Sequence, residues 1–353
     1  MLSAKAKNIT PYTAGEQPQD GVYIKLNTNE NPYPPVPEIY QCLAGADFSN
    51  LRLYPDPNNV KLRQAIAQKE GVGVDNIFVG NSSDEVLALA FLTLFEKTKG
   101  ALLFPDITYS FYKVWADLYD IPYKTLPLDD SYKIRVKDYL DKGSKCGIIF
   151  ANPNAPTSIL LERDAIESIL KANKSIPVVV DEAYIEFAEK NASSVPLIKK
   201  YKNLIVVKTF SKSHSLAGAR VGYAVGDKVA IDGLFRIKDC FNSYPLDRIC
   251  ADIATIAITA SDYYNDITAK IISTRNKTAD KLAKIGYTVL PSSANFLFVS
   301  HPKFSGTDIY NYLKKNKILV RVWDKPRLSE YARITIGTET DMNELCKRLE
   351  MFK

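Results

Sequence analysis

The sequence contains few of the residues that build metal centres, disulfide frameworks or membrane spans. Its 353 residues include only two histidines, His214 and His301, and five scattered cysteines that never occur as Cys-x-x-Cys. This composition argues against a zinc site and favours free thiols in a reducing compartment. The most apolar stretch, residues 86–95, is far shorter than the roughly 20 residues that cross a bilayer, and the first twelve residues lack the apolar centre of an export signal. We therefore expect a cytoplasmic protein with no membrane span and no metal.

Several signatures of nucleotide-binding proteins and hydrolases are also missing. Residues 71–76, Gly-Val-Gly-Val-Asp-Asn, fail the G-x-G-x-x-G pattern because Asn76 stands where the last glycine belongs. The chain has no Gly-Lys dipeptide for a P-loop and no G-x-S-x-G nucleophile elbow. Its formal charge of +6 is spread without a basic block, so we expect no nucleic-acid partner.

The first 245 residues alternate short apolar runs with amphipathic segments. Runs that are buried on both faces and separated by helices indicate a parallel α/β sheet. Before them, the Pro-rich stretch that ends near Pro37 cannot form a helix interior, and we predict an extended arm there. The predicted strands cover residues 77–80, 101–104, 147–151, 177–181 and 203–208.

The pattern changes near Pro245. Two long helical stretches follow, residues 248–260 and 263–286, and the second stops at a glycine as helices commonly do. Short strands, a helix and a closing helix from about Glu339 then predict a smaller α+β domain. We expect an arm over residues 1–37, a large domain over 38–245 and a small domain over 246–353, with part of the N-terminal segment packing on the small domain.

Polar side chains stand where predicted strands end, which is where open α/β sheets bind ligands. Asp181 closes the run at 177–181, and Lys212 lies just beyond the run at 203–208. The two residues form either a buried structural ion pair or part of a reactive site. Residues 80–85, Gly-Asn-Ser-Ser-Asp-Glu, join a strand to a helix. They can serve as a helix cap or can present amide N–H groups to a phosphate.

Taken together, these segments resemble the fold-type I pyridoxal-phosphate-dependent aminotransferases, and most closely the histidinol-phosphate branch of that family. The resemblance implies an α/β fold with a large pyridoxal-phosphate-binding domain and a smaller C-terminal α+β domain. It runs almost from end to end of the chain. The matching segments are residues 10–12, 26–34, 52–57, 80–85, 105–112, 152–157, 179–187, 209–223 and 326–338.

The resemblance implies a role for each residue around the cofactor ring. Lys212 would bind pyridoxal 5'-phosphate as a Schiff base and then move the proton between the substrate Cα and the cofactor C4′. Asp181 would keep the pyridine nitrogen protonated, Tyr184 would donate to the phenolic oxygen, and Tyr109 would stack on the ring. Relatives read N-P-N-N-P-T-G where this chain reads NPNAPTS. Because Ala155 occupies the usual asparagine position, the contact to the phenolic oxygen passes to Asn154.

The family likewise implies how the anionic groups are bound. Tyr54 of a neighbouring subunit would reach the phosphate, so the resemblance implies a homodimer with shared sites. We expect His214, which lies beside the lysine, to be a packing or supporting residue. The phosphate would lie among the backbone N–H groups of Ser82, Ser83 and Asp84 and the side chains of Ser211 and Arg220; the substrate would contact Arg333, Arg321, Arg327, Tyr12 and Asn27.

The implied reaction transfers the amino group of L-histidinol phosphate to 2-oxoglutarate and yields imidazole-acetol phosphate and L-glutamate, a step of histidine biosynthesis. Two other activities remain open on the same scaffold, namely threonine-phosphate decarboxylation and aromatic-amino-acid transamination. A non-enzymatic regulator built on this fold would carry an added DNA-binding module, and we expect none before the arm.

Overall fold

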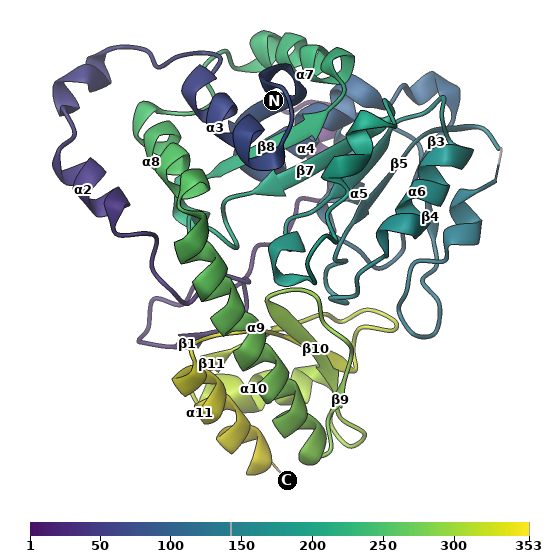
Figure 1. Cartoon of the computed structure of the whole chain (residues 1–353). Coiled ribbons are helices and arrows are strands. Elements are labelled where there is room, and N and C mark those ends of the chain that lie inside the picture. The colour runs from purple at the N-terminus through teal and green to yellow at the C-terminus, as the bar shows by residue number, and fades with distance from the viewer. Residues whose placement is uncertain (142, 353) are drawn as a thin grey trace.

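A seven-stranded sheet forms the centre of the large domain in the computed structural model, which describes residues 1–141 and 143–352 (Figure 1). Its strands lie in the order β2-β8-β7-β6-β5-β3-β4, and within this sheet of the described chain only β8 runs antiparallel to its neighbours. The predicted mostly parallel sheet is therefore confirmed. The strands are β2 (Ile77–Asn81), β3 (Ala101–Pro105), β4 (Tyr123–Leu126), β5 (Lys145–Ala151), β6 (Val178–Asp181), β7 (Leu204–Thr209) and β8 (Val221–Gly226).

Helices cover both faces of this sheet, and the strand side chains alternate between two cores. In β6, Val178 and Val180 belong to one core and Val179 to the other, as the period of two requires. One core also contains residues of α3 (Val60–Glu70), α6 (Arg163–Ala172) and α8 (Arg248–Thr259), with α2 (Glu38–Ala44) beside them; the other contains residues of α4 (Ser82–Leu94), α5 (Phe111–Leu118) and α7 (Lys228–Phe241).

The C-terminal part of the described chain forms a second, antiparallel sheet with its own core. The strand order is β12-β13-β10-β9, and Arg321 of β12 pairs with Arg333 of β13. This arrangement is the α+β unit that the sequence predicts. Its elements are α9 (Ser261–Lys284), β9 (Thr288–Val289), β10 (Phe296–Ser300), α10 (Gly306–Lys315), β11 (Ile318–Leu319), β12 (Arg321–Val322), β13 (Tyr331–Thr335) and α11 (Glu339–Glu350).

Helix α9 connects the two units and belongs to both (Figure 1). Its first residues, including Tyr264 and Ile267, lie in the core of the large sheet, whereas Ile271 and Leu282 lie in the core of the small one. Helix α8 packs entirely in the large core. The change of pattern near Pro245 therefore marks the end of the strand–helix alternation rather than the end of the large core, and the boundary at 245/246 stays a prediction.

The N-terminal segment combines extended chain with short elements. The prediction of a wholly extended arm is wrong at α1 (Ala4–Asn8), a short helix that is capped at its N-terminus by Ser3. Residues 32–37 are non-helical, as their prolines require. Strand β1 (Ile24–Lys25) pairs in parallel with β11, and Leu26 lies in the small core.

Among the described residues, no helix is long and apolar enough to cross a membrane. Short 3₁₀ helices complete the described elements. They are η1 (Phe48–Arg52), η2 (Val74–Asn76), η3 (Lys97–Lys99), η4 (Val136–Tyr139), η5 (Ile185–Phe187), η6 (Val195–Lys199) and η7 (Ala217–Ala219).

Candidate active site

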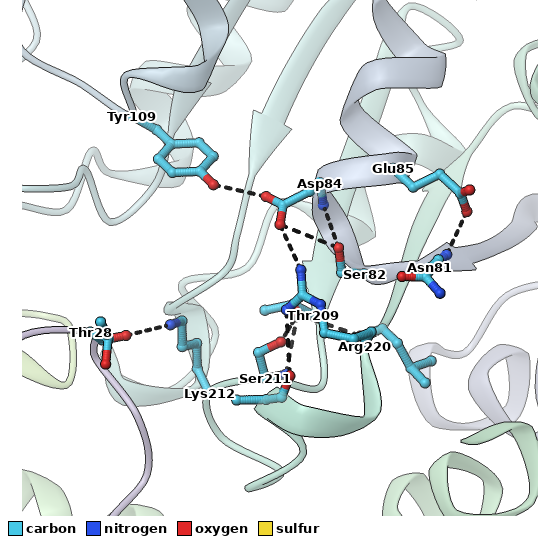
Figure 2. A network of polar contacts seen from close by, with 12 residues as sticks. Thr28, Asn81, Ser82, Asp84, Glu85, Tyr109, Thr209, Ser211, Lys212 and Arg220 are labelled. Carbon is cyan, nitrogen blue, oxygen red and sulfur yellow. Dashed lines mark hydrogen bonds and ion pairs between the residues drawn. The ribbon is translucent and has the colours of Figure 1, made fainter. Parts of the chain in front are cut away.

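A lysine lies at the carboxyl edge of the large sheet, beyond β7. The Lys212 ammonium donates to the carbonyl of Thr28 at 3.1 Å (Figure 2). It lies 5.8 Å from the centre of the Tyr184 ring. Burial, with a smaller contribution from the positive charge of Arg333, lowers the pKa of Lys212 to about 8. A substantial fraction of this amine is therefore neutral, and nucleophilic, near neutral pH.

Asp181 ends the neighbouring strand, β6, at the same edge. Its carboxylate is only 4% exposed and accepts a hydrogen bond from the Tyr112 hydroxyl at 2.8 Å. Burial raises its pKa to about 6. No ion pair involving Asp181 occurs in the described part of the chain, so this is a desolvated carboxylate that a cationic ligand would stabilise.

The start of α4 comes close to β8 because Gly222 has no side chain. A Cβ at Gly222 would lie 2.3 Å from the backbone nitrogen of Ser83, so only glycine allows this approach. The backbone N–H of Ser82 donates to the carbonyl of Arg220 at 2.7 Å, and Ser82 has a φ of 68°. The first turn of α4, with its positive dipole end, is thereby held against the loop that follows Lys212.

Asp84 gathers two further side chains at this helix start (Figure 2). Its carboxylate pairs with Arg220 at 2.8 Å and accepts from the Tyr109 hydroxyl at 2.8 Å. Burial and the charge of Asp84 raise the pKa of Tyr109 well above its usual value. Ser211 lies nearby, hydrogen-bonded to Thr209 at 3.0 Å. The cluster joins helix α4, the Lys212 loop and an aromatic ring.

Two arginines of the small domain form a separate cationic pair. Arg321 and Arg333 are partners in register across β12 and β13, and both guanidinium groups lie near the ring of Trp323, at 5.8 and 5.4 Å. Arg333 donates to the carbonyl of Asn27 at 2.9 Å, and its buried Nε has no partner among the described residues. A buried guanidinium with an unpaired N–H is suited to a carboxylate or phosphate.

The arm folds over this region. Tyr12 stacks on Phe111, with ring centres 4.3 Å apart, and lies 6.5 Å from Tyr109. Asn27 is buried and donates to the carbonyl of Glu16 at 2.8 Å. Arg321 donates to the carbonyls of Thr13 and Ala14 at 3.0 and 3.2 Å. The arm thus places the side chains of Tyr12 and Asn27 beside the aromatic and cationic groups.

Arg327 does not join the arginine pair, and its role in substrate binding stays a prediction. Its guanidinium donates to the carbonyls of Leu128 and Asp129 at 3.2 and 2.6 Å and pairs with Asp106 at 3.7 Å. These contacts use the side chain to join the small domain to the loop after β4.

The side-chain amide of Asn154 is engaged by other residues of the large domain. Both hydrogens of its Nδ2 are used, by the carbonyl of Ile107 and the hydroxyl of Thr157, each at 3.0 Å, and its oxygen accepts from Thr108 at 2.8 Å. It therefore has no donor left for the phenolic oxygen predicted as its partner.

Two more of the predicted residues lie outside the cluster within this chain. Tyr54 is 79% exposed and stacks on Tyr244 at 4.6 Å, so within one chain it contacts none of the site residues. His214 is buried between Phe210 and Tyr264, and burial lowers its pKa to about 4. It is a packing residue, as expected. No group of His, Cys, Asp or Glu suited to a metal occurs within residues 1–141 and 143–352.

Sequence reasoning missed several polar contacts from the arm and α5. Asn29 donates to the Tyr184 hydroxyl at 3.0 Å, and Asn31 donates to the carbonyl of Lys212 at 3.0 Å. The available signal was the spacing of Asn27, Asn29 and Asn31, an unusual run of amides beside an apolar segment. Tyr112 was detectable as the residue one helical turn after Tyr109.

Comparisons with known proteins show the family and the fold. Residues 22–349 match the family model described as aminotransferase class I and II. Histidinol-phosphate aminotransferase 1 of Hydrogenovibrio crunogenus is 51% identical, over 97% of this chain and 94% of the relative, and the histidinol-phosphate aminotransferase of Chromohalobacter salexigens is 47% identical, over 99% and 97%. The fold is similar to histidinol-phosphate aminotransferase from Sinorhizobium meliloti in complex with pyridoxal-5'-phosphate, with a TM-score of 0.89, 23% identity and coverage of 99% and 97%.

Proposed function

Because this chain belongs to the aminotransferase class I and II family, we propose that it transfers the amino group of L-histidinol phosphate to 2-oxoglutarate with pyridoxal 5'-phosphate as cofactor. The products are imidazole-acetol phosphate and L-glutamate, and the reaction belongs to histidine biosynthesis. The observation that carries this choice of substrate is the identity of 51% with a histidinol-phosphate aminotransferase over nearly the whole of both chains.

The residues at the sheet edge fit this cofactor. A buried carboxylate without a cationic partner suits a protonated pyridine nitrogen, and the amine of Lys212 suits its aldehyde. The N-terminus of α4, held close by Gly222, suits its phosphate. When bound, the cofactor supplies an electron-withdrawing ring that stabilises negative charge at the substrate Cα.

Lys212 acts as the proton carrier in this proposal. Its amine, with a pKa lowered to about 8, takes the proton from the substrate Cα and would deliver it to the cofactor C4′. Asn31 holds the carbonyl of Lys212 at 3.0 Å and so fixes the start of the side chain. Asp181 holds the proton of the ring nitrogen, and Tyr109 orients the ring by stacking.

The phosphate of the cofactor would be held by backbone and side-chain donors together. Of the predicted backbone donors in the first turn of α4, the N–H of Ser82 already donates to the carbonyl of Arg220 at 2.7 Å and that of Asp84 to the Ser82 hydroxyl at 3.1 Å, so Ser83 supplies the remaining N–H. Ser211 and Arg220 add a hydroxyl and a guanidinium. Because Arg220 also pairs with the carboxylate of Asp84 at 2.8 Å, the phosphate would share the guanidinium with that carboxylate.

Arg333 and Arg321 would bind the anionic groups of the substrates. Arg333, with its unpaired Nε, takes either the carboxylate of glutamate or 2-oxoglutarate or the phosphate of histidinol phosphate, and Arg321 helps to hold that phosphate. Arg321 reaches that phosphate after releasing the carbonyls of Thr13 and Ala14. Tyr12 and Asn27 close the site from the arm and exclude water.

A second copy of the chain completes the site in this proposal. Tyr54, exposed in one chain, would donate its hydroxyl to the cofactor phosphate of the partner, which makes the working unit a homodimer. Support comes from the apolar side chains exposed around Tyr54, which are Phe48, Leu51 and Leu53. We place the protein in the cytoplasm because all five cysteines are free thiols.

A half-reaction screen tests the proposed function. The purified protein loaded with pyridoxal phosphate is mixed separately with histidinol phosphate, histidinol, glutamate, phenylalanine and O-phosphothreonine, and the visible absorption of the cofactor is followed. Histidinol phosphate and glutamate should bleach the band, and 2-oxoglutarate should restore it. A preference for phenylalanine, or release of carbon dioxide from O-phosphothreonine, would assign the scaffold to one of its other activities.

A further inference from the structure

A short chain of buried hydrogen bonds ends on the hydroxyl of Tyr184. The backbone N–H of Asn29 donates to the hydroxyl oxygen of Thr335 at 2.9 Å, and that hydroxyl donates to the side-chain oxygen of Asn29 at 3.1 Å. The amide nitrogen of Asn29 then donates to the Tyr184 hydroxyl at 3.0 Å. Asn29 and Thr335 are only 1% and 2% exposed, so water does not offer these groups other partners.

The direction of this chain follows from both bonds of the Thr335 hydroxyl. A backbone N–H can only donate, so the oxygen of Thr335 accepts from Asn29 there, and its single proton goes to the Asn29 side-chain oxygen. That bond orients the amide, because only its nitrogen remains to face Tyr184. An amide nitrogen also only donates. The Tyr184 oxygen is therefore an acceptor from Asn29, and its own proton must go elsewhere.

The surroundings of Tyr184 leave this proton for a ligand. The ring packs with Ala155, Ala294 and Phe296, none of which carries a polar side chain, and the described residues supply no acceptor for the Tyr184 hydroxyl. The hydroxyl belongs to the residue whose ring lies 5.8 Å from the amine of Lys212.

We propose that Asn29 and Thr335 are positioning residues that commit the Tyr184 hydroxyl to donate to the phenolic oxygen of the bound cofactor. This inference rests on the proposed function for the identity of the cofactor. The arm, through Asn29, and β13, through Thr335, would thus contribute to the chemistry of a cofactor ring that is bound by the large domain. Asn29 adopts a φ of 56°, which asparagine tolerates better than most residues, and Asn295 donates to its carbonyl at 3.1 Å.

Thr335→Val tests the proposal with little change of shape, since it removes only the hydroxyl that orients the amide. The Asn29 amide is then free to turn its oxygen toward Tyr184 and take the phenolic proton. A donor to the phenolic oxygen favours the deprotonated form of the cofactor, so its loss should raise the pH midpoint of the visible absorption change by about one to two pH units. Thr335→Ser keeps the hydroxyl and should retain the wild-type midpoint. Tyr184→Phe lacks the phenolic donor altogether, so it gives the largest shift of the midpoint that loss of this bond can cause.

A binding measurement separates positioning from general structural damage. The cofactor-free protein is titrated with pyridoxal phosphate and with its analogue that lacks the ring hydroxyl. Thr335→Val should weaken the binding of pyridoxal phosphate by about tenfold and leave the affinity for the analogue unchanged. Equal weakening of both ligands, or an unshifted pH midpoint, overturns the proposal. If Thr335→Val does not fold, Asn29→Asp carries the same expectations, because its carboxylate can only accept from Tyr184 and aspartate also tolerates a positive φ.

Failure of the proposed function would look different. A wild-type protein that binds no pyridoxal phosphate, or whose band does not respond to histidinol phosphate, refutes the assigned reaction. A wild-type protein that passes both checks, with variants that show neither effect, refutes only the role of Asn29 and Thr335.

Discussion

The buried carboxylate of Asp181 should make the cofactor-free protein less stable as the pH rises. Its pKa of about 6 in the folded chain lies above its ordinary value of 3.8, so the unfolded chain ionises first as the pH increases. Stability from this group is present below pH 3.8 and is lost as the pH rises toward 6. At 1.36 kcal/mol per unit of pKa, the full loss is about 3 kcal/mol, of which about 2 kcal/mol falls between pH 4.5 and pH 8.

Asp181→Asn removes this ionisation and so isolates its contribution. Urea denaturation of both cofactor-free proteins at pH 4.5 and pH 8 gives the difference in free energy of unfolding at each pH. We expect that difference to move by about 2 kcal/mol in favour of the variant at pH 8. Any constant cost of the new amide, such as an unpaired N–H, cancels between the two pH values.

The same variant should lose function when loaded with cofactor. The neutral amide cannot hold the proton of the ring nitrogen, so exchange of the substrate Cα proton in deuterated water should fall by several orders of magnitude. Glu182→Gln is a matched control, since Glu182 is the next residue, is fully buried and has its pKa raised to about 7 by burial. It should show the stability effect and retain exchange. An identical stability difference at both pH values, or unchanged exchange in Asp181→Asn, would refute the reasoning.

Three further predictions concern the amine, the dimer and the arginines. Lys212→Ala should abolish turnover and leave no linkage that borohydride can reduce, and peptide mapping that finds the cofactor on another lysine would contradict the site. Mixing Tyr54→Ala with Lys212→Ala chains should partly restore activity through dimers with one complete site; demonstrated exchange without recovery would place Tyr54 outside the partner's site. Arg333→Lys should slow both half-reactions by about tenfold to a hundredfold, whereas Arg321→Lys should slow the one with histidinol phosphate more than the one with glutamate, as stopped-flow absorption would measure.

Local patterns predicted the parts of the site that follow directly from strand order. Apolar runs ending in Asp181 and just before Lys212 were visible in the sequence, and parallel strands bring their carboxyl ends to one edge. Strand β8 was not predicted, because its glycines and alanine dilute the apolar pattern. It runs antiparallel to both of its neighbours, β7, which precedes it in the chain, and β2, whose residues lie far away in the chain.

Contacts between distant segments explain the remaining differences. The pattern of residues 326–338 does not show that Arg327, with a φ of 65°, turns toward the carbonyls of Leu128 and Asp129. Similarly, nothing near Asn154 reveals that its side chain also bonds Thr108 and the carbonyl of Ile107, which lie far away in the chain. A side chain with several donors and acceptors can satisfy them in many ways, and only the fold decides which partners are within reach.

The pairing of β1 with β11 sets the order in which the newly made protein can mature on the ribosome. Ile24 leaves the exit tunnel early, but its partner Ile318 emerges roughly 300 residues later, on the order of 15 to 60 seconds at ordinary rates of synthesis. The residues just after β1 include Thr28, Asn29 and Asn31, which contact Lys212 and Tyr184. A nascent chain with a finished large sheet still lacks the pairing with β11 and the bond from Thr335 to Asn29, so the reactive pocket is completed only when translation is nearly finished.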